Sequence, residues 1–279
     1  MSGSDLKSLI WHYDPSLPLC IIAVILFALS TFWHLIQVCK YQQKFFIFLA
    51  FGGILQVIGY VARIGCIHDL NNTNYYVVHT LGVLLAPIFY AVSIYSLLGK
   101  IVQYIGAQDL SPIRPTRITC IFVIGDILSF FMQSTGGGMM ASGDASKTDT
   151  GNNIILIGLV IQLIFFFFFI FLTVVFHSRT RSQAVKPNEG NWKLLLKILE
   201  LSSFLIFVRS IYRVVEYAQG FSGYLISHEV YLYVFDTLMM LSVQLVYNFV
   251  HPGTVFNAKA QAAVQDIEMA QVPRVKIHA

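Results

Sequence analysis

Long runs of apolar residues cover most of the chain, and short polar segments separate them. A helix needs about 20 mostly apolar residues to cross the hydrocarbon core of a bilayer. Seven runs reach this length, and they cover residues 17–39, 45–66, 76–102, 118–140, 153–177, 194–218 and 230–250. The pattern predicts an all-α, polytopic membrane protein in which residues 17–250 form a bundle of seven transmembrane helices.

Basic residues are distributed unevenly among the segments between these runs. When the first, third and fifth loops and the tail are placed on one side of the membrane, thirteen Lys and Arg residues gather there, against Lys7 and Lys147 on the other side. Because cytoplasmic loops carry an excess of Lys and Arg, we expect residues 1–16 to be extracellular and residues 251–279 to form a cytoplasmic tail. An N-glycosylation sequon at Asn71 falls in an outer loop and agrees with this orientation.

The composition excludes a large soluble catalytic domain. Of the 279 residues, 56% are hydrophobic and 11% are charged, whereas soluble domains carry about 25% charged residues. The net charge of +4 comes from the loops that face one side of the membrane, and we expect no nucleic-acid partner.

Charged residues inside the predicted spans are the first candidates for a functional site. There are six of them: Arg63, Asp126, Arg209, Arg213, Glu216 and Asp236. A charge at the centre of a spanning helix costs about 2.5 to 3.5 kcal/mol on insertion scales, so each must face the bundle or water and find a partner. Arg209, Arg213 and Glu216 recur at i, i+4 and i+7 and share one helix face.

We infer a buried polar cluster in the outer half of the bundle, lined by the second, fourth, sixth and seventh helices, with Gln56 and Gln133 as further candidates. The cluster is either a site for a ligand or a polar head group, or a set of interhelical contacts that fix the packing. Pro87 should kink the third helix and free a carbonyl group.

Motifs of common enzyme classes are absent from the sequence. It contains no GxxxxGK[ST], HExxH or GxSxG motif, and its four cysteines have no metal-binding spacing. His34 and His79 could in principle ligate haem, but no facing pair is evident, and polar packing is the favoured interpretation. We expect a protein that is not an enzyme and has no catalytic residue, metal site or cofactor.

Several short motifs resemble those of the fungal RTA-like proteins, also called the lipid-translocating exporter family. They are Gly59-Tyr60 with Arg63; Leu84 to Pro87 with Tyr95; Gly125-Asp126 with Gln133 and Gly136 to Gly138; Gly158 with Gln162; Arg209 to Arg213 with Glu216-Tyr217; His228-Glu229 with Asp236; and His251-Pro252-Gly253. They extend over all seven predicted helices. Gln56 stands where the family commonly has an acid, so a charge pair or proton step that uses this acid in relatives would differ here.

The resemblance implies a plasma-membrane protein that translocates or exports amphipathic lipid-like molecules, such as sphingoid long-chain bases, and confers resistance to toxic amphiphiles. Its partners would be membrane lipids and an amphipathic small molecule, whose cationic head Asp126, Glu216 or Asp236 could accept. Because no ATPase motif is present, the chain would use a gradient or act with a partner. The alternatives are a receptor-like lipid or stress sensor that signals through its basic loops, and a porphyrin or haem transporter.

Overall fold

The computed structural model describes residues 15–69, 73–140, 145–182, 191–220 and 223–257 of the chain, and every regular element within these residues is a helix. The long helices are α2 (Leu17–Tyr41), α3 (Ile47–His68), α4 (Thr73–Tyr104), α5 (Pro115–Met140), α6 (Ala145–Ser182) and α7 (Trp192–Ala218). The last span combines α8 (Glu229–Leu232), a π-helical turn η3 (Tyr233–Thr237) and α9 (Leu238–Phe249). Two short 3-10 turns, η1 (Lys44–Phe46) and η2 (Gln108–Leu110), lie between long helices. The predicted all-α class is confirmed.

Each of the seven predicted runs corresponds to a helical segment. Among the described residues, six helical segments are long and apolar enough to cross a membrane: Leu17–Tyr41, Lys44–His68, Asn74–Tyr104, Arg117–Met140, Ser146–Arg181 and Glu229–Asn257. The helix outside this set is α7, which is 27 residues long but carries six charged side chains. It packs against α4, α6 and α9, and its charges belong to the bundle interior or to the helix start. That α7 crosses the membrane stays a prediction.

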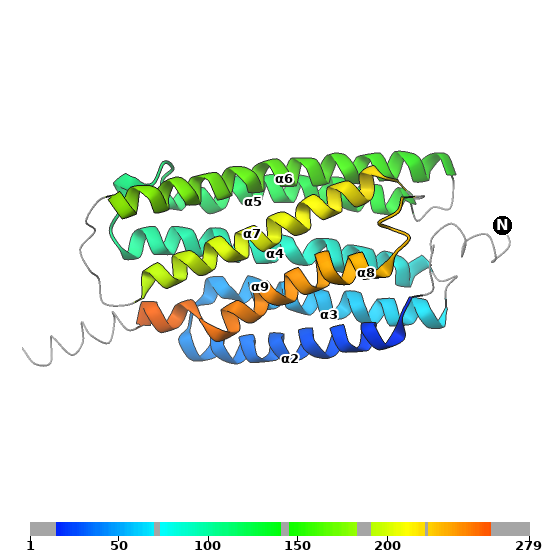
Figure 1. The fold of residues 1–279 in the computed structure, drawn as a ribbon, viewed down its shortest axis with the longest axis horizontal. Coiled ribbons are helices and arrows are strands. Elements are labelled where there is room, and N and C mark those ends of the chain that lie inside the picture. The colour runs from blue at the N-terminus through cyan, green and yellow to red at the C-terminus, as the bar shows by residue number, and fades with distance from the viewer. Residues whose placement is uncertain (1–14, 70–72, 141–144, 183–190, 221–222, 258–279) are drawn as a thin grey trace, which may run out of the picture.

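The helices run side by side along the long axis of the molecule, with α5 and α6 on one side and α2 and α3 on the other (Figure 1). Close approach depends on small residues, as in other membrane bundles. A Cβ added to Gly136 of α5 would lie 2.5 Å from the carbonyl oxygen of Gly151 on α6, and one added to Gly82 of α4 would lie 3.0 Å from the Cα of Gly59 on α3. These glycines therefore set the spacing of two helix pairs.

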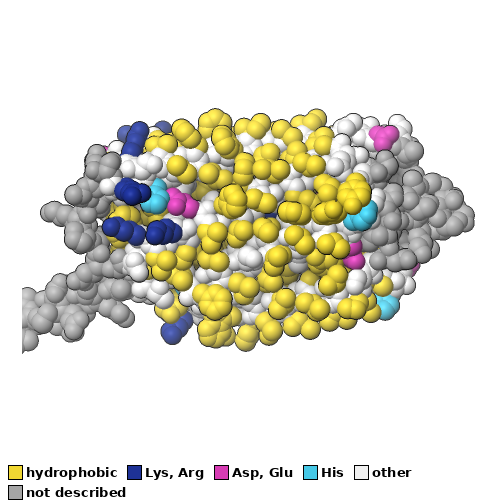
Figure 2. Space-filling model, in the orientation of Figure 1, with side chains coloured by type: hydrophobic (Ala, Val, Ile, Leu, Met, Phe, Trp, Pro, Cys, Tyr) yellow, Lys and Arg dark blue, Asp and Glu magenta, His cyan; other side chains and the backbone are white. Residues whose placement is uncertain are grey.

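Apolar side chains cover the middle of the visible face (Figure 2). Phe32, Phe131 and Phe204 are each at least 60% exposed, which is unfavourable in water but suits a surface in contact with lipid tails. Both the exposed apolar surface and the helix lengths therefore indicate an integral membrane protein.

Basic side chains gather at one end of the bundle, which we call the basic end (Figure 2). It holds exposed residues at the end of α2, in η1, at the end of α4, just before and at the start of α5, at the end of α6 and at the start of α7: Lys40, Lys44, Lys100, Arg114, Arg117, Arg179, Arg181, Lys193 and Lys197. The opposite end, where α2 begins and α7 ends, we call the N-end. Lys147 is the one described basic residue near that end outside the bundle interior.

Candidate functional site

Three arginines and three acids form two groups of ion pairs in the half of the bundle nearer the N-end, and we call the two groups together the charge network. Its members are Arg63 of α3, Arg209, Arg213 and Glu216 of α7, Glu229 of α8 and Asp236 of η3. The formal charges of the network sum to zero, as expected for charges that must be compensated inside a membrane protein.

The centre of the network is Asp236, which is fully buried and accepts contacts from two arginines of α7. Its Oδ1 lies 2.5 Å from Nε of Arg209, and its Oδ2 lies 2.9 Å from Nη2 of Arg213. Arg209 and Arg213 are one helical turn apart, so both guanidinium groups point to the same side of α7. Asp236 lies in the π turn, where an extra residue changes which side chains of a helix face the interior.

Arg213 also contacts Glu216, the acid one turn further along α7. Nη1 of Arg213 donates to Oε2 of Glu216 at 2.8 Å, and the Tyr212 hydroxyl donates to Oε1 at 2.9 Å. Arg213 thus joins two acids, and it links the buried centre at Asp236 to the more open side of the network at Glu216.

The remaining pair joins α3 to the start of the last span. Nη2 of Arg63 lies 2.8 Å from Oε1 of Glu229, and the Glu229 carboxylate also accepts from the backbone N–H of Ser16 at 2.9 Å. Nη1 of Arg63 is 3.1 Å from Nε2 of His79 on α4, whose Nδ1 is 3.0 Å from the carbonyl oxygen of Gly59. His79 is therefore a packing residue that orients Arg63, in agreement with the polar-packing interpretation of this histidine.

Pro87 frees a carbonyl group, and the structure shows which donor satisfies it. A proline at position 87 has no N–H to donate to the carbonyl of Val83 one turn earlier. Nη2 of Arg209 donates to this oxygen at 3.1 Å. α4 continues through the proline, and the charge network supplies the hydrogen bond that the helix lacks.

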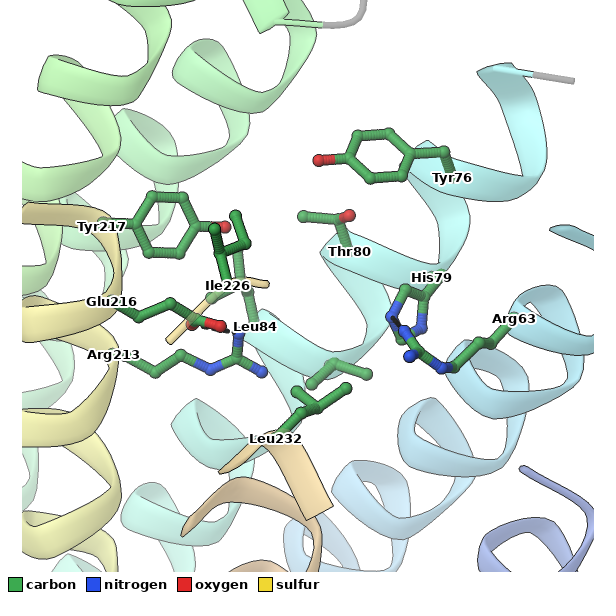
Figure 3. Close-up of a pocket in the computed structure, with 11 residues that line it drawn as sticks. Arg63, Tyr76, His79, Thr80, Leu84, Arg213, Glu216, Tyr217, Ile226 and Leu232 are labelled. Carbon is green, nitrogen blue, oxygen red and sulfur yellow. Dashed lines mark hydrogen bonds and ion pairs between the residues drawn. The ribbon is translucent and has the colours of Figure 1, made fainter. Parts of the chain in front are cut away.

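A cavity of about 80 Å³ opens beside the network (Figure 3). Arg213, Glu216 and Tyr217 project from α7 toward α4 (Figure 3). Arg63 of α3 lines the cavity beside His79 of α4 (Figure 3). The other lining residues are Tyr76, Thr80, Val83 and Leu84 of α4, together with Ile226 and Leu232. Because one water needs roughly 10 to 15 Å³ of such space, the cavity can hold several waters or a small polar head group.

The structure brings five of the seven predicted site residues into this network and places two elsewhere. Arg63, Arg213 and Glu216 line the cavity, while Arg209 and Asp236 lie buried behind it. Gln133 instead belongs to the contact between α5 and α6, where its Nε2 donates to Ser129 at 2.8 Å and to Gln162 at 3.0 Å. Asp126 is buried, and no ion pair joins it to any residue that the structure describes.

Two further predicted features lie outside the network. Gln56 is fully buried on α3, and neither polar atom of its side-chain amide has a hydrogen-bond partner in the described part of the chain. Asn71, the sequon residue, lies outside the described residues. Within the described ranges, no group of three or more His, Cys, Asp and Glu side chains is placed to hold a metal ion.

Glu229 is the network member that the charge count missed. It directly precedes the predicted 230–250 run and was therefore counted as a loop residue. The signal that could have identified it is the His228-Glu229 pair among the family motifs. With Glu229 included, the three arginines are balanced without Asp126.

Comparison with known proteins identifies the family to which the sequence is similar. The sequence model of the family described as RTA1 like protein matches residues 49–259. Among curated Saccharomyces cerevisiae proteins, Protoporphyrin uptake protein 1 is 32% identical, with 87% of this chain and 92% of the relative covered. Protein RTA1 is also 32% identical, over 87% of this chain and 84% of the relative. Sphingoid long-chain base transporter RSB1 is 27% identical, over 93% of this chain and 77% of the relative.

No solved structure matches this chain significantly. The family model covers most of the sequence, and two of these relatives exceed 30% identity over most of their length. The resemblance found in the motifs is therefore confirmed, and the chain belongs to the RTA1-like family of transporter-like membrane proteins.

Proposed function

We propose that this chain moves amphipathic lipid-like molecules across or out of the bilayer, without acting as an enzyme on them. The observation that carries the proposal is the cavity between α4 and α7, which combines buried charges with a surrounding surface suited to lipid. The head group of the amphiphile would occupy the cavity while its apolar part stays among helices and lipid tails.

The pair formed by Arg213 and Glu216 can receive a head group of either sign. An ammonium group in the cavity would take the place of Arg213 at the Glu216 carboxylate, and Arg213 would keep its contact with Asp236 at 2.9 Å. A carboxylate would take the place of Glu216 at Arg213, and the Tyr212 hydroxyl would continue to hold Glu216 at 2.9 Å. In both cases each displaced group retains one hydrogen-bonding or ion-pair partner, which lowers the cost of the exchange.

This property is compatible with the names of two relatives, one a sphingoid long-chain base transporter and one a protoporphyrin uptake protein. Long-chain bases carry an ammonium group and porphyrins carry carboxylates. The first is our leading substrate class for this chain, and the second is the alternative.

A flux assay with the purified full chain in liposomes tests the proposal. We expect labelled long-chain base to cross the membrane faster than in protein-free vesicles. Glu216→Gln should remove most of this flux, and Arg213→Gln should instead remove the flux of a labelled porphyrin. Glu200→Gln is the matched control, because Glu200 is a half-buried α7 acid that pairs with His177 rather than with the network. No flux of either substrate above protein-free vesicles would overturn the proposal.

We further propose that the N-end faces outward, that residues 251–279 are cytoplasmic and that the protein resides in the plasma membrane. The asymmetry of basic residues between the two ends supports this orientation. A tag on the N-terminus should be reached by antibody on intact cells, and a C-terminal tag should need permeabilisation. Expression of the chain should also raise the resistance of cells to toxic amphiphiles, and this gain should depend on Glu216.

A further inference from the structure

Asp126 is a fully buried carboxyl group that takes no part in the charge network. It lies on α5 with 0% of its surface exposed, and neither carboxyl oxygen has a hydrogen-bond partner among the described residues. The Tyr95 hydroxyl of α4 is its polar neighbour. Tyr95 is also fully buried, and its hydroxyl makes no hydrogen bond of normal geometry.

The surroundings of this pair are apolar. The ring of Tyr95 packs against Phe169 of α6 at 4.6 Å and Phe122 of α5 at 5.3 Å between centroids. Phe165 of α6 lies against Gly125, the residue before Asp126. Of the titratable and charged groups on the described parts of α4, α5 and α6, Tyr95 is the one that interacts with Asp126. Among the residues that the structure describes, no Lys or Arg side chain pairs with Asp126.

Burial in these surroundings favours one of the two protonation states of Asp126. An ionised carboxylate that is buried without a partner costs several kcal/mol, and the same acid with its proton is neutral and avoids most of that cost. The network arginines do not compensate a charge on Asp126, because they already pair with Asp236, Glu216 and Glu229.

We propose that Asp126 is a proton-binding site of this protein, separate from the head-group cavity, and that Tyr95 is its positioning residue. In the described conformation the carboxyl group carries the proton. When the contact between α4 and α5 opens to water, the proton passes from the carboxyl oxygen to water and leaves a carboxylate, and reprotonation restores the neutral group.

α4 connects this site to the cavity. Its first turns supply Tyr76, His79 and Thr80 to the cavity wall, and its second half supplies Tyr95 to Asp126. Pro87 lies between the two parts, where the backbone bond to Val83 is missing. A change in α4 at the cavity can therefore alter the contact between Tyr95 and Asp126. This coupling rests on the proposed transport function, whereas the proton site itself does not.

Infrared spectroscopy of the purified protein tests the proton site without any substrate. At neutral pH we expect a carbonyl stretching band of a protonated carboxylic acid that shifts in D₂O. Asp126→Asn should remove the band, and Asp109→Asn, a change in an exposed acid of η2, should leave it. Tyr95→Phe should shift the frequency of the carbonyl band without removing the band. This variant therefore still tests the assignment if Asp126→Asn does not fold. A missing band in the unmodified chain, or one that persists in Asp126→Asn, would overturn the assignment.

A second measurement tests the coupling. An imposed proton gradient should change the flux of long-chain base severalfold in liposomes that contain the unmodified chain and the Asp109→Asn variant. Asp126→Asn cannot exchange a proton at this position, so its flux should not respond to the gradient. If the infrared band is present but flux ignores the gradient in the unmodified chain, the coupling is wrong and the proton site stands. If flux is absent altogether, the proposed transport function fails independently.

Discussion

Arg209 and Asp236 form a buried ion pair in which Nε and Oδ1 lie 2.5 Å apart, and neither side chain is more than 1% exposed. They come from α7 and from the π turn of the last span, so the pair fixes the relative position of two helices. Removing one partner of a buried pair leaves an uncompensated charge, which costs about 3 to 5 kcal/mol.

We expect Asp236→Ala to produce a large loss of thermal stability in detergent, because both Arg209 and Arg213 then lose an acid. The double variant Arg209→Met with Asp236→Leu should recover part of the loss, since Arg213 still pairs with Glu216 at 2.8 Å. Glu200→Ala serves as the comparison, because its partly exposed pair with His177 should contribute about 1 kcal/mol or less. Equal losses from Asp236→Ala and Glu200→Ala would contradict the central role of Asp236.

The link between Pro87 and Arg209 predicts a measurable coupling. Pro87→Ala restores the N–H that can donate to the Val83 carbonyl, so this oxygen no longer depends on Arg209. Replacement of Arg209 by Met should therefore cost less stability in the Pro87→Ala background than in the unmodified chain. The difference in a double-mutant cycle should be about 1 kcal/mol, a usual value for one hydrogen bond. Additive effects would show that the bond of Arg209 to Val83 contributes nothing.

Two glycines of α5 should respond in opposite ways to the same substitution. Gly136→Ala would place its Cβ 2.5 Å from the Gly151 carbonyl oxygen and should separate α5 from α6, with a clear loss of melting temperature. A Cβ at Gly138 has nothing within 4 Å. Gly138→Ala should therefore be neutral or stabilise the helix by up to about 1 kcal/mol. A similar response of both variants would argue against the close approach of the two helices.

Basic-end substitutions separate transport from signalling. Arg181→Ala and Lys193→Ala remove exposed charges at the basic end, whereas the cavity lies toward the N-end. They should leave the liposome flux within about twofold of the unmodified chain, since exposed charges make little difference to packing. If the protein were instead a sensor acting through these loops, resistance in cells would fall while binding at the cavity stayed intact. Measurement of flux and resistance on the same two variants distinguishes these outcomes.

Local patterns in the sequence predicted much of the architecture. Runs of about 20 apolar residues define the helices because each spanning helix must satisfy its backbone groups internally. The spacing of Arg209, Arg213 and Glu216 placed them on one face, and the structure confirms that Arg213 and Glu216 are in contact. The charged residues of α7 also distinguish it from the six helical segments that are long and apolar enough to cross a membrane. These features depend on residues within a single helical segment, either on its overall hydropathy or on side chains one or two turns apart.

The pairing of charges between helices was decided only by the tertiary structure. Arg63 and Glu229 are 166 positions apart, and no periodicity relates them. The sequence grouped Asp126 with the other buried charges because all of them lie inside spans. Packing places it instead beside Tyr95, in apolar surroundings, while Glu229 balances Arg63. Hydropathy determines that an acidic residue lies inside a span. The rotation of each helix and its neighbours determine whether the carboxyl group pairs with an arginine, lines a cavity or stays buried without a cation.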